Sequence, residues 1–372
     1  MLARFPEAEM HIPDGYLSPS TCAVLYGASA PFWYTALRRV KKSLSSRLVP
    51  LLSVMAALSF VVMMFNLPLP GGTTGHAVGV GIATIILGPW ASILAISIAL
   101  AIQGVFFGDG GITTLGANCF NMAIVGSLVA YAVYRLAAGR AALTAPRRVV
   151  AAALAGYAAI NASAFCAAVE FGIQPIFFKD SSGAPLYAPY PLGIAIPAMM
   201  IGHLTFAGLA ELVLSAGVVA YFQRANPSLL KLTAPAAAGG ETTALDGGGI
   251  WRTVRPLWIG LALLLLLTPL GILAAGTAWG EWSARDFSSP QTRQMIAAGS
   301  RNAAPPIDPP SGLARLSTLW TAPFPQYAPS FVRRPALGYA LSAMFGSGAV
   351  ILVSLLAGSL ATRLRNNRHE LP

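Results

Sequence analysis

The sequence predicts an all-α protein that is embedded in a membrane. Of its 372 residues, 55% are hydrophobic and only 10% are charged, and the mean hydropathy is +0.65. Soluble domains carry about 25% charged residues, so this chain has too little polar surface to coat a soluble globule. The net charge of +11 comes from short basic clusters between long uncharged stretches, which is typical of membrane flanks. We therefore expect a multi-pass protein of the cell (inner) membrane, in contact with lipid and without a nucleic-acid partner.

Membrane-spanning helices need about 20 mostly apolar residues, and the chain offers such stretches along most of its length. The third and fourth are short and meet at Gly88-Pro89-Trp90, which predicts a tight helical hairpin. Nine stretches qualify or nearly qualify: residues 20–37, 48–65, 74–88, 90–107, 118–137, 149–171, 192–222, 256–279 and 337–362. We expect a helix over each of them.

The distribution of basic residues predicts the orientation of these helices. With the N-terminus outside, the inner loops and the C-terminal tail hold 16 of the 24 Lys and Arg residues. The outer loops at 66–73, 108–117 and 172–191 then hold only Lys179. Because cytoplasmic loops carry an excess of Lys and Arg, we expect the N-terminus outside and the C-terminus inside.

A change in composition at residues 226–255 separates the first seven predicted helices from the last two. Runs of Ala, Pro and Gly in this segment predict a flexible cytoplasmic linker. The outer loop between the last two helices, residues 280–336, holds nine of the 28 prolines. We expect this loop to be largely irregular extended chain.

The predicted outer loops hold most of the polar residues that could carry chemistry. His11 precedes the first helix, and His76 ends the glycine-rich segment GGTTGH, so the topology brings both histidines toward one surface. Histidine is a favoured ligand of nickel, cobalt, copper and zinc, but two histidines are too few for a tight metal site. The pair is also compatible with a helix cap and a polar turn near the lipid headgroups.

Several motifs in this region occur in an order that resembles one family. The segment MHIPDGYLSP is followed by GGTTGH, LGPW, FGDGG and LGANCFNM. Over residues 10–222 the chain resembles the CbiM/NikM family, the metal-capturing S components of energy-coupling-factor transporters for cobalt and nickel. Residues 256–372 resemble, more loosely, the NikN/CbiN-type accessory part, although the PDGLE motif of many such domains is absent from the sequence.

The resemblance implies a seven-helix S-component bundle at residues 10–225, the linker at 226–255, and a two-helix domain at 256–372. It also implies partners, namely a CbiQ/NikQ-like transmembrane coupling subunit and CbiO/NikO-like ABC ATPases. The chain itself has no GxxxxGK[ST] loop, so we expect no ATP hydrolysis and no other enzymatic activity from it. The substrate would be Co²⁺ or Ni²⁺, with a slight preference for cobalt, and no cofactor is implied.

The resemblance also implies the metal ligands, which in this sequence are Met10, His11 and His76. A free amine at Met10, the amide nitrogen of His11 and its imidazole would form fused chelate rings of five and six atoms. His76 would complete a plane of nitrogens, which suits Ni²⁺ and Co²⁺, whereas Mg²⁺ and Ca²⁺ prefer oxygen ligands.

Residues 1–9 depart from the family, because an acylated Met10 has no amine. Either translation starts at Met10, or the extension is trimmed, or the site is different, and we favour a start at Met10. The resemblance and the polar loops suggest supporting roles around the ligands for Asp109, Asn118, Asn121 and Gln103. For Asp109, a plain turn is the alternative.

His203 and Glu211 are eight residues apart on the seventh predicted helix and could share one face. We expect His203 to pair with Glu211 or with a backbone carbonyl and to stabilise helix packing. Two other functions remain as alternatives for the chain as a whole, an ion-gradient-driven metal permease and a membrane-embedded enzyme. The polar residues crowd one surface instead of the membrane midplane, which favours capture from outside over the permease.

Overall fold

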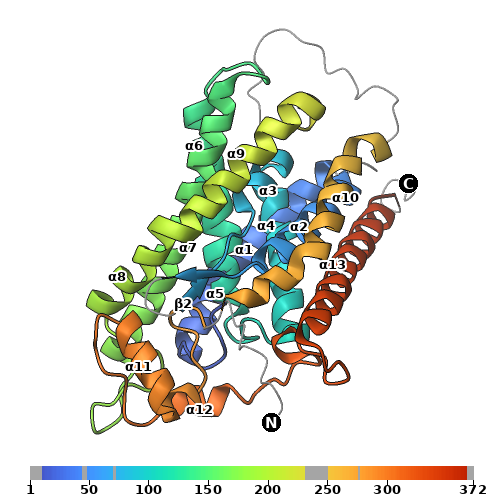
Figure 1. The fold of residues 1–372 in the computed structure, drawn as a ribbon. Helices are drawn as coiled ribbons and strands as arrows, with labels where there is room; N and C mark the ends of the chain where they lie inside the picture. The colour runs from blue at the N-terminus through green and yellow to red at the C-terminus, as the bar shows by residue number, and fades with distance from the viewer. Residues whose placement is uncertain (1–10, 44–47, 70–72, 231–249, 275–276, 367–372) are drawn as a thin grey trace, which may run out of the picture.

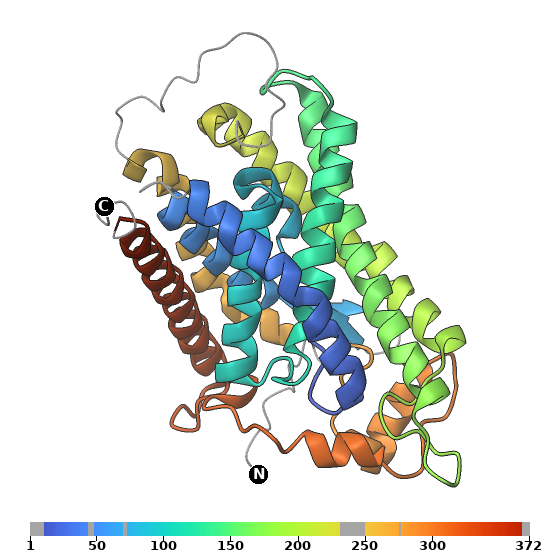
Figure 2. The ribbon, with the colours of Figure 1, turned by 180° about the vertical axis from the view of Figure 1, so that it is seen from behind.

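The computed structural model describes residues 11–43, 48–69, 73–230, 250–274 and 277–366. Long helices run between two ends of a bundle, and short helices and loops cover one of these ends (Figure 1, Figure 2). Residues 11–18, 64–69, 73–79, 103–118, 178–191 and 277–334 form this covered end, which we call the site end. Within the described residues, six helical segments are long and apolar enough to cross a membrane. The chain is therefore a multi-pass membrane protein.

The first half of the chain forms a helical bundle with one small β-hairpin. Its elements are α1 (Pro19–Ser43), α2 (Leu48–Met63), β1 (Leu67–Leu69), β2 (Thr73–Gly75), α3 (Val80–Leu87), α4 (Pro89–Ile102), η1 (Gln103–Phe107), α5 (Leu115–Asn118), η2 (Cys119–Val125), α6 (Gly126–Ala138) and α7 (Pro146–Phe177).

The second half completes the bundle and covers the site end. Its elements are α8 (Leu192–Gly202), η3 (His203–Ala207), α9 (Gly208–Ala225), η4 (Pro227–Leu230), α10 (Ile250–Leu267), η5 (Thr268–Leu273), η6 (Asp286–Ser288), α11 (Pro290–Gly299), α12 (Ser311–Leu316), η7 (Pro325–Tyr327) and α13 (Pro335–Asn366). Helix α7 packs along α6 and α9, while α13 packs along α2.

The predicted hairpin at Gly88-Pro89 is confirmed, but the helix that enters it is shorter than expected. Gly88 has a φ of +77°, and Pro89 starts α4 at once. The stretch predicted as helical from residue 74 instead begins with β2, which pairs antiparallel with β1, and α3 starts only at Val80. Gly79 has a φ of +73°, a left-handed conformation that a helix cannot continue through.

The expectation of a largely irregular loop at residues 280–336 is confirmed only in part. Most of the segment lies outside helices, but it also contains η6, α11, α12 and η7. Three of its prolines, Pro290, Pro325 and Pro335, are the first residues of α11, η7 and α13. Proline suits this position because it lacks the backbone N–H that would have no acceptor in the first helical turn. Backbone hydrogen bonds attach the loop to the first half of the chain, from Gly312 N to Leu186 O at 2.8 Å and from Phe324 N to Phe106 O at 2.9 Å.

Helices α3, α7 and α9 approach closely at small residues. A Cβ on Gly81 would lie 2.4 Å from Ser215 Oγ and 2.9 Å from Gly156 Cα, so any side chain there would collide with its neighbours. Such small-residue contacts let backbones approach one another inside a membrane, where the lipid supplies no hydrophobic driving force. The contact holds α9 against the start of α3, beside the segment that carries His76.

Candidate metal site

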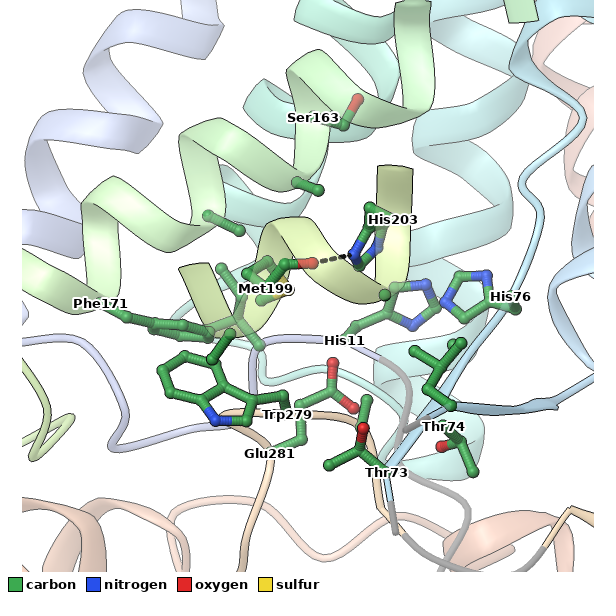
Figure 3. A pocket seen from close by; sticks show the side chains of 18 of the residues that line it. His11, Thr73, Thr74, His76, Ser163, Phe171, Met199, His203, Trp279 and Glu281 are labelled. Atoms are coloured by element: carbon green, nitrogen blue, oxygen red, sulfur yellow. Dashed lines mark hydrogen bonds between the residues drawn. The ribbon is translucent and has the colours of Figure 1, made fainter. Parts of the chain in front are cut away.

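A cavity of about 220 Å³ lies at the site end, between the N-terminal segment, the β-hairpin, α7, α8 and the segment after α10. Figure 3 shows the side chains of His11, His76, His203 and Glu281 around this cavity. Its other lining residues include Thr73, Thr74, Asn118, Asn121, Met122, Ser163, Phe171, Met199, Ala278, Trp279 and Arg301. Most of the wall is apolar, so the nitrogen and oxygen atoms gather at a few positions.

The two predicted ligand histidines lie next to each other in this cavity. The ring centroids of His11 and His76 are 5.2 Å apart, with an interplanar angle of 67°, and both side chains are buried. His76 directs Nδ1 to its neighbour's carbonyl, Ala77 O, at 3.0 Å. The convergence of the two histidines that the topology predicted is therefore confirmed.

His11 is held by a carboxylate. Its Nδ1 lies 2.9 Å from Asp109 Oδ1, and both side chains are almost fully buried. Its other ring nitrogen, Nε2, is also buried and makes no hydrogen bond with any described residue. Ligating histidines commonly donate one ring N–H to a carboxylate, which fixes the ring and leaves the other nitrogen for the metal. The arrangement of His11 and Asp109 matches this pattern.

Asp109 is more than a turn residue. Gly108, with a φ of +69°, ends η1, and the backbone N–H of Asp109 donates to Gln103 O at 3.2 Å. The second carboxylate oxygen, Oδ2, accepts a hydrogen bond from the hydroxyl of Tyr327 at 2.5 Å. Gln103 donates from Nε2 to the same hydroxyl at 3.2 Å. Both predicted residues, Gln103 and Asp109, thus belong to one network behind His11.

Asn118 and Asn121 have separate roles. Asn118 pairs with both backbone groups of Ile12, accepting from its N–H and donating to its carbonyl, each at 3.1 Å. This pair fixes the chain directly after His11. Asn121 donates to the buried carboxylate of Glu170 at 2.8 Å and lines the cavity, so it supports the wall and does not touch the histidines' hydrogen bonds.

The predicted pairing of His203 with Glu211 is wrong, whereas the alternative with a backbone carbonyl is confirmed. His203 Nδ1 lies 2.9 Å from Met199 O, one turn earlier in α8. The Glu211 carboxylate instead accepts the backbone N–H groups of Val78, Gly79 and Gly81 at 2.8, 2.8 and 3.1 Å. The first N–H groups of a helix have no acceptor within the helix, so Glu211 caps the start of α3 and anchors the segment after His76.

Three π-helical segments surround the site, and each carries a polar residue that sequence reasoning singled out. Segment η1 begins with Gln103, η2 contains Asn121, and η3 begins with His203. A π-helical turn is wider than an α-helical turn and is frequent at functional sites. Segments η2 and η3 interrupt apolar helices and contribute Asn121 and His203 to the cavity wall, whereas η1 ends α4.

Residues after the linker also build the site, and sequence reasoning missed them. Trp279, Glu281 and Arg301 line the cavity, and Tyr327 joins the network of Asp109. The sequence feature that could have indicated them is the segment AWGEW, which places a glutamate among aromatic residues directly after an apolar helix.

Part of the predicted site lies outside the described residues. This holds for the predicted ligand Met10 and for residues 1–9 that precede it; most of the predicted linker at 226–255 also lies outside the described residues. Among the described residues, no three His, Cys, Asp or Glu side chains are close enough together to hold a metal ion.

Comparison with known proteins identifies the family. A family model described as a cobalt uptake substrate-specific transmembrane region, CbiM, matches residues 11–229, and the PDGLE domain model matches residues 255–363, although the PDGLE motif itself is absent. A fused nickel transport protein NikMN from Rhodobacter capsulatus is 54% identical over 96% of this chain and 99% of its own length. A probable fused nickel transport protein LarMN from Lactiplantibacillus plantarum is 39% identical over 97% of this chain and 100% of its own.

Solved structures agree with this result. A crystal structure of a transition metal transporter is 48% identical in sequence, with a TM-score of 0.55. The match covers 57% of this chain and 92% of the chain in that structure. The chain therefore belongs to the CbiM family, continues into a PDGLE domain, and is a nickel or cobalt transport protein of the membrane.

Proposed function

We propose that this chain is the substrate-capture subunit of an ATP-driven energy-coupling-factor importer and that it takes up Ni²⁺ at the outer face of the membrane. The observation that carries this proposal is the cavity in which His11 and His76 lie side by side, with Asp109 bonded to the first ring. In the orientation expected from the basic residues, the site end faces outward. A metal entering from outside would meet these imidazoles first.

The proposed ligands are nitrogen atoms of His11 and His76, together with the amine of Met10 where the chain begins there. In His11, Nδ1 contacts Asp109, which supports Nε2 as the metal-binding nitrogen. A neutral imidazole that donates a hydrogen bond from Nδ1 keeps its free lone pair on Nε2. The six-membered chelate ring that the resemblance implies would use Nδ1 instead, and closing it would break the contact with Asp109.

The choice of nickel rests on ligand chemistry and on relatives. Imidazole and amine nitrogens suit Ni²⁺ and Co²⁺, and the Irving–Williams order makes Ni²⁺ the tighter of the two. The two relatives that match this chain over nearly its whole length are named as nickel transport proteins. These two facts outweigh the slight preference for cobalt that the resemblance implied.

The energy source would be supplied by partners. The sequence has no nucleotide-binding GxxxxGK[ST] loop, so we propose a CbiQ/NikQ-like coupling subunit and CbiO/NikO-like ATPases at the cytoplasmic side. Uptake of Ni²⁺ by cells that produce this chain should therefore require both partners. Uptake by the chain alone would favour the gradient-driven permease.

Titration of the purified chain with Ni²⁺ by calorimetry tests the site. Removing either ligand should weaken binding by 100-fold or more in His11→Ala and His76→Ala, because a chelate that loses one donor loses both its bond and its geometry. His203→Ala is the matched histidine control, since its Nδ1 is bonded to Met199 O, and we expect a change of less than about threefold. Wild-type affinity in His11→Ala or in His76→Ala would remove that residue from the site.

One further variant distinguishes the two binding modes of His11. Asp109→Ala should weaken Ni²⁺ binding about 10- to 100-fold if Asp109 orients a ring that binds through Nε2. The same variant should strengthen binding if the metal binds through Nδ1, because the contact that competes with the metal is then gone. The sign of the change therefore decides which nitrogen is the ligand.

A further inference from the structure

A second cavity, of about 550 Å³, lies away from the metal site, between α2, the start of α3, α9 and α10. Helix α10 packs along α2, and α9 packs along α7, whereas α9 and α10 make few contacts with each other. The cavity occupies the space that this arrangement leaves between the last helix of the first domain and the first helix of the second. Its wall includes Leu58, Val62, Leu214, Val218, Leu257 and Leu264.

The cavity is apolar and opens sideways. The hydroxyl of Ser59, which lines it, donates to Val78 O at 2.7 Å and so is already engaged. Gly217 on α9 and Gly260 on α10 also line it, and a Cβ at either position would meet no atom within 4 Å. Both helices belong to segments that are long and apolar enough to cross a membrane, so the opening between them faces the lipid.

The size of the cavity favours a thin occupant. An α-helix with its side chains is about 10–12 Å wide and rises 5.4 Å per turn, which amounts to roughly 420–610 Å³ per turn. A cavity of about 550 Å³ therefore has room for about one turn of a partner's helix. An acyl chain is a single file of methylene groups, so a much greater length of it fits the same space.

Positive charge lies at one end of the cavity. Arg224 follows the lining residues Tyr221 and Phe222 on α9, and Arg255 directly precedes the lining residue Pro256 on α10. Figure 1 shows the end of α9 and the start of α10 at the same end of the bundle, opposite to the site end. Both arginine side chains are exposed, and neither forms a salt bridge with a carboxylate that the structure describes. Arginine suits phosphate, and basic pockets between membrane helices bind anionic lipid headgroups.

We propose that this cavity binds an acyl chain of an anionic glycerophospholipid, whose phosphate lies at Arg224 and Arg255. The lipid fills the space between α9 and α10 and thereby joins the two domains inside the membrane. In the orientation expected from the basic residues, it comes from the inner leaflet. This binding site is separate from the metal cavity and does not depend on which metal the chain carries.

The headgroup is tested by native mass spectrometry of the full chain in a neutral detergent. The chain is titrated with dioleoylphosphatidylglycerol or with dioleoylphosphatidylcholine, which has the same acyl chains and no net charge. Because each basic residue near the surface contributes about fivefold to the binding of an anionic lipid, the chain should hold phosphatidylglycerol roughly 25-fold more tightly. Arg224→Gln and Arg255→Gln should each weaken phosphatidylglycerol binding about fivefold and leave phosphatidylcholine binding unchanged. Arg140→Gln is the matched control, since Arg140 is exposed on the turn after α6, away from the cavity.

The acyl chain is tested by filling the cavity. Gly217→Leu and Gly260→Leu place a side chain in the open space and should abolish retention of one lipid at concentrations that saturate the wild type. Phosphatidylglycerol should raise the Tm of the wild type and not that of these variants, because a ligand stabilises only the folded state that binds it. Gly348→Leu is the matched control: Gly348 is an exposed glycine of α13, also with no atom within 4 Å of its Cβ position. All three substitutions change helix propensity alike.

Four results would overturn the proposal. They are equal binding of the two lipids by the wild type, wild-type retention of phosphatidylglycerol in Gly217→Leu, an effect of Arg140→Gln or Gly348→Leu as large as that of the cavity variants, and a wild-type dimer that Gly217→Leu dissociates. The last result would assign the cavity to a second copy of the chain. The arginine variants leave the cavity open, so they test the proposal independently of whether a leucine variant folds.

Discussion

Gly110 lies where a methyl group would collide with His11. A Cβ at this position would be 2.9 Å from His11 Cβ and 3.0 Å from Asn118 Nδ2, and Gly110 has a φ of +81°. Carbon atoms in ordinary contact are about 3.5–4.0 Å apart, so the two groups would have to separate by roughly 0.6–1.1 Å. Binding sites require ligands placed to within about 0.5 Å. Gly110→Ala should therefore displace His11 beyond that tolerance.

Two costs contribute to the effect of Gly110→Ala, and a control separates them. The left-handed backbone alone costs about 1–2 kcal/mol in stability. The collision adds about 1–3 kcal/mol. Gly183→Ala carries the first cost without the second, because Gly183 has a φ of +85° and no atom within 4 Å of its Cβ position.

The assay is a Ni²⁺ titration of both variants together with their thermal unfolding. We expect Gly110→Ala to lose at least about 10-fold in affinity, because a displaced ligand weakens the site as much as a lost orienting partner does. Gly183→Ala should be less stable than the wild type but bind normally. Equal affinities in the two variants would refute the reasoning, since backbone strain would then be the whole effect.

Three further predictions concern the surroundings of the site. Glu211→Gln should destabilise the chain by about 2 kcal/mol, measured by thermal unfolding in detergent, because an amide cannot accept all three N–H groups of the α3 start. Glu281→Gln should slow Ni²⁺ association several-fold in stopped-flow measurements at low salt, since it removes a carboxylate from the cavity wall, and unchanged rates would exclude an electrostatic role. A chain that begins at Met10 should bind Ni²⁺ at least about 10-fold more tightly than the chain with residues 1–9, because an acylated nitrogen loses its basicity. Equal affinity of the two forms would exclude the amine as a ligand.

Local sequence was enough to predict much of the scaffold. Long apolar stretches mark the membrane helices, because a chain segment in lipid must satisfy its own backbone hydrogen bonds. Gly88-Pro89 marks the hairpin, because a left-handed residue followed by a helix-starting proline is a local backbone requirement. The polar segments around His11 and His76 stood out because their composition differs from that of the apolar helices around them.

Tertiary structure decided which polar groups meet. Glu211 accepts the backbone N–H of Val78, 133 residues earlier, and Tyr327 donates to Asp109 across 218 residues. Neither contact leaves a periodic pattern in the sequence, because two side chains can form a hydrogen bond from any two positions that packing brings together. The prolines of the outer loop predicted irregular chain, and two of them, Pro290 and Pro325, instead start short helices in the fold.

The sequence by itself thus determined that this protein is a helical membrane protein with a histidine-bearing polar end, because hydropathy and backbone requirements are properties of short segments. Only the tertiary structure decided that His11 contacts Asp109, that Glu211 anchors the chain beside His76, and that the second domain lines the cavity. The physical reason is that a buried polar group needs a hydrogen-bond partner close to it in space, and that partner can come from any position in the sequence.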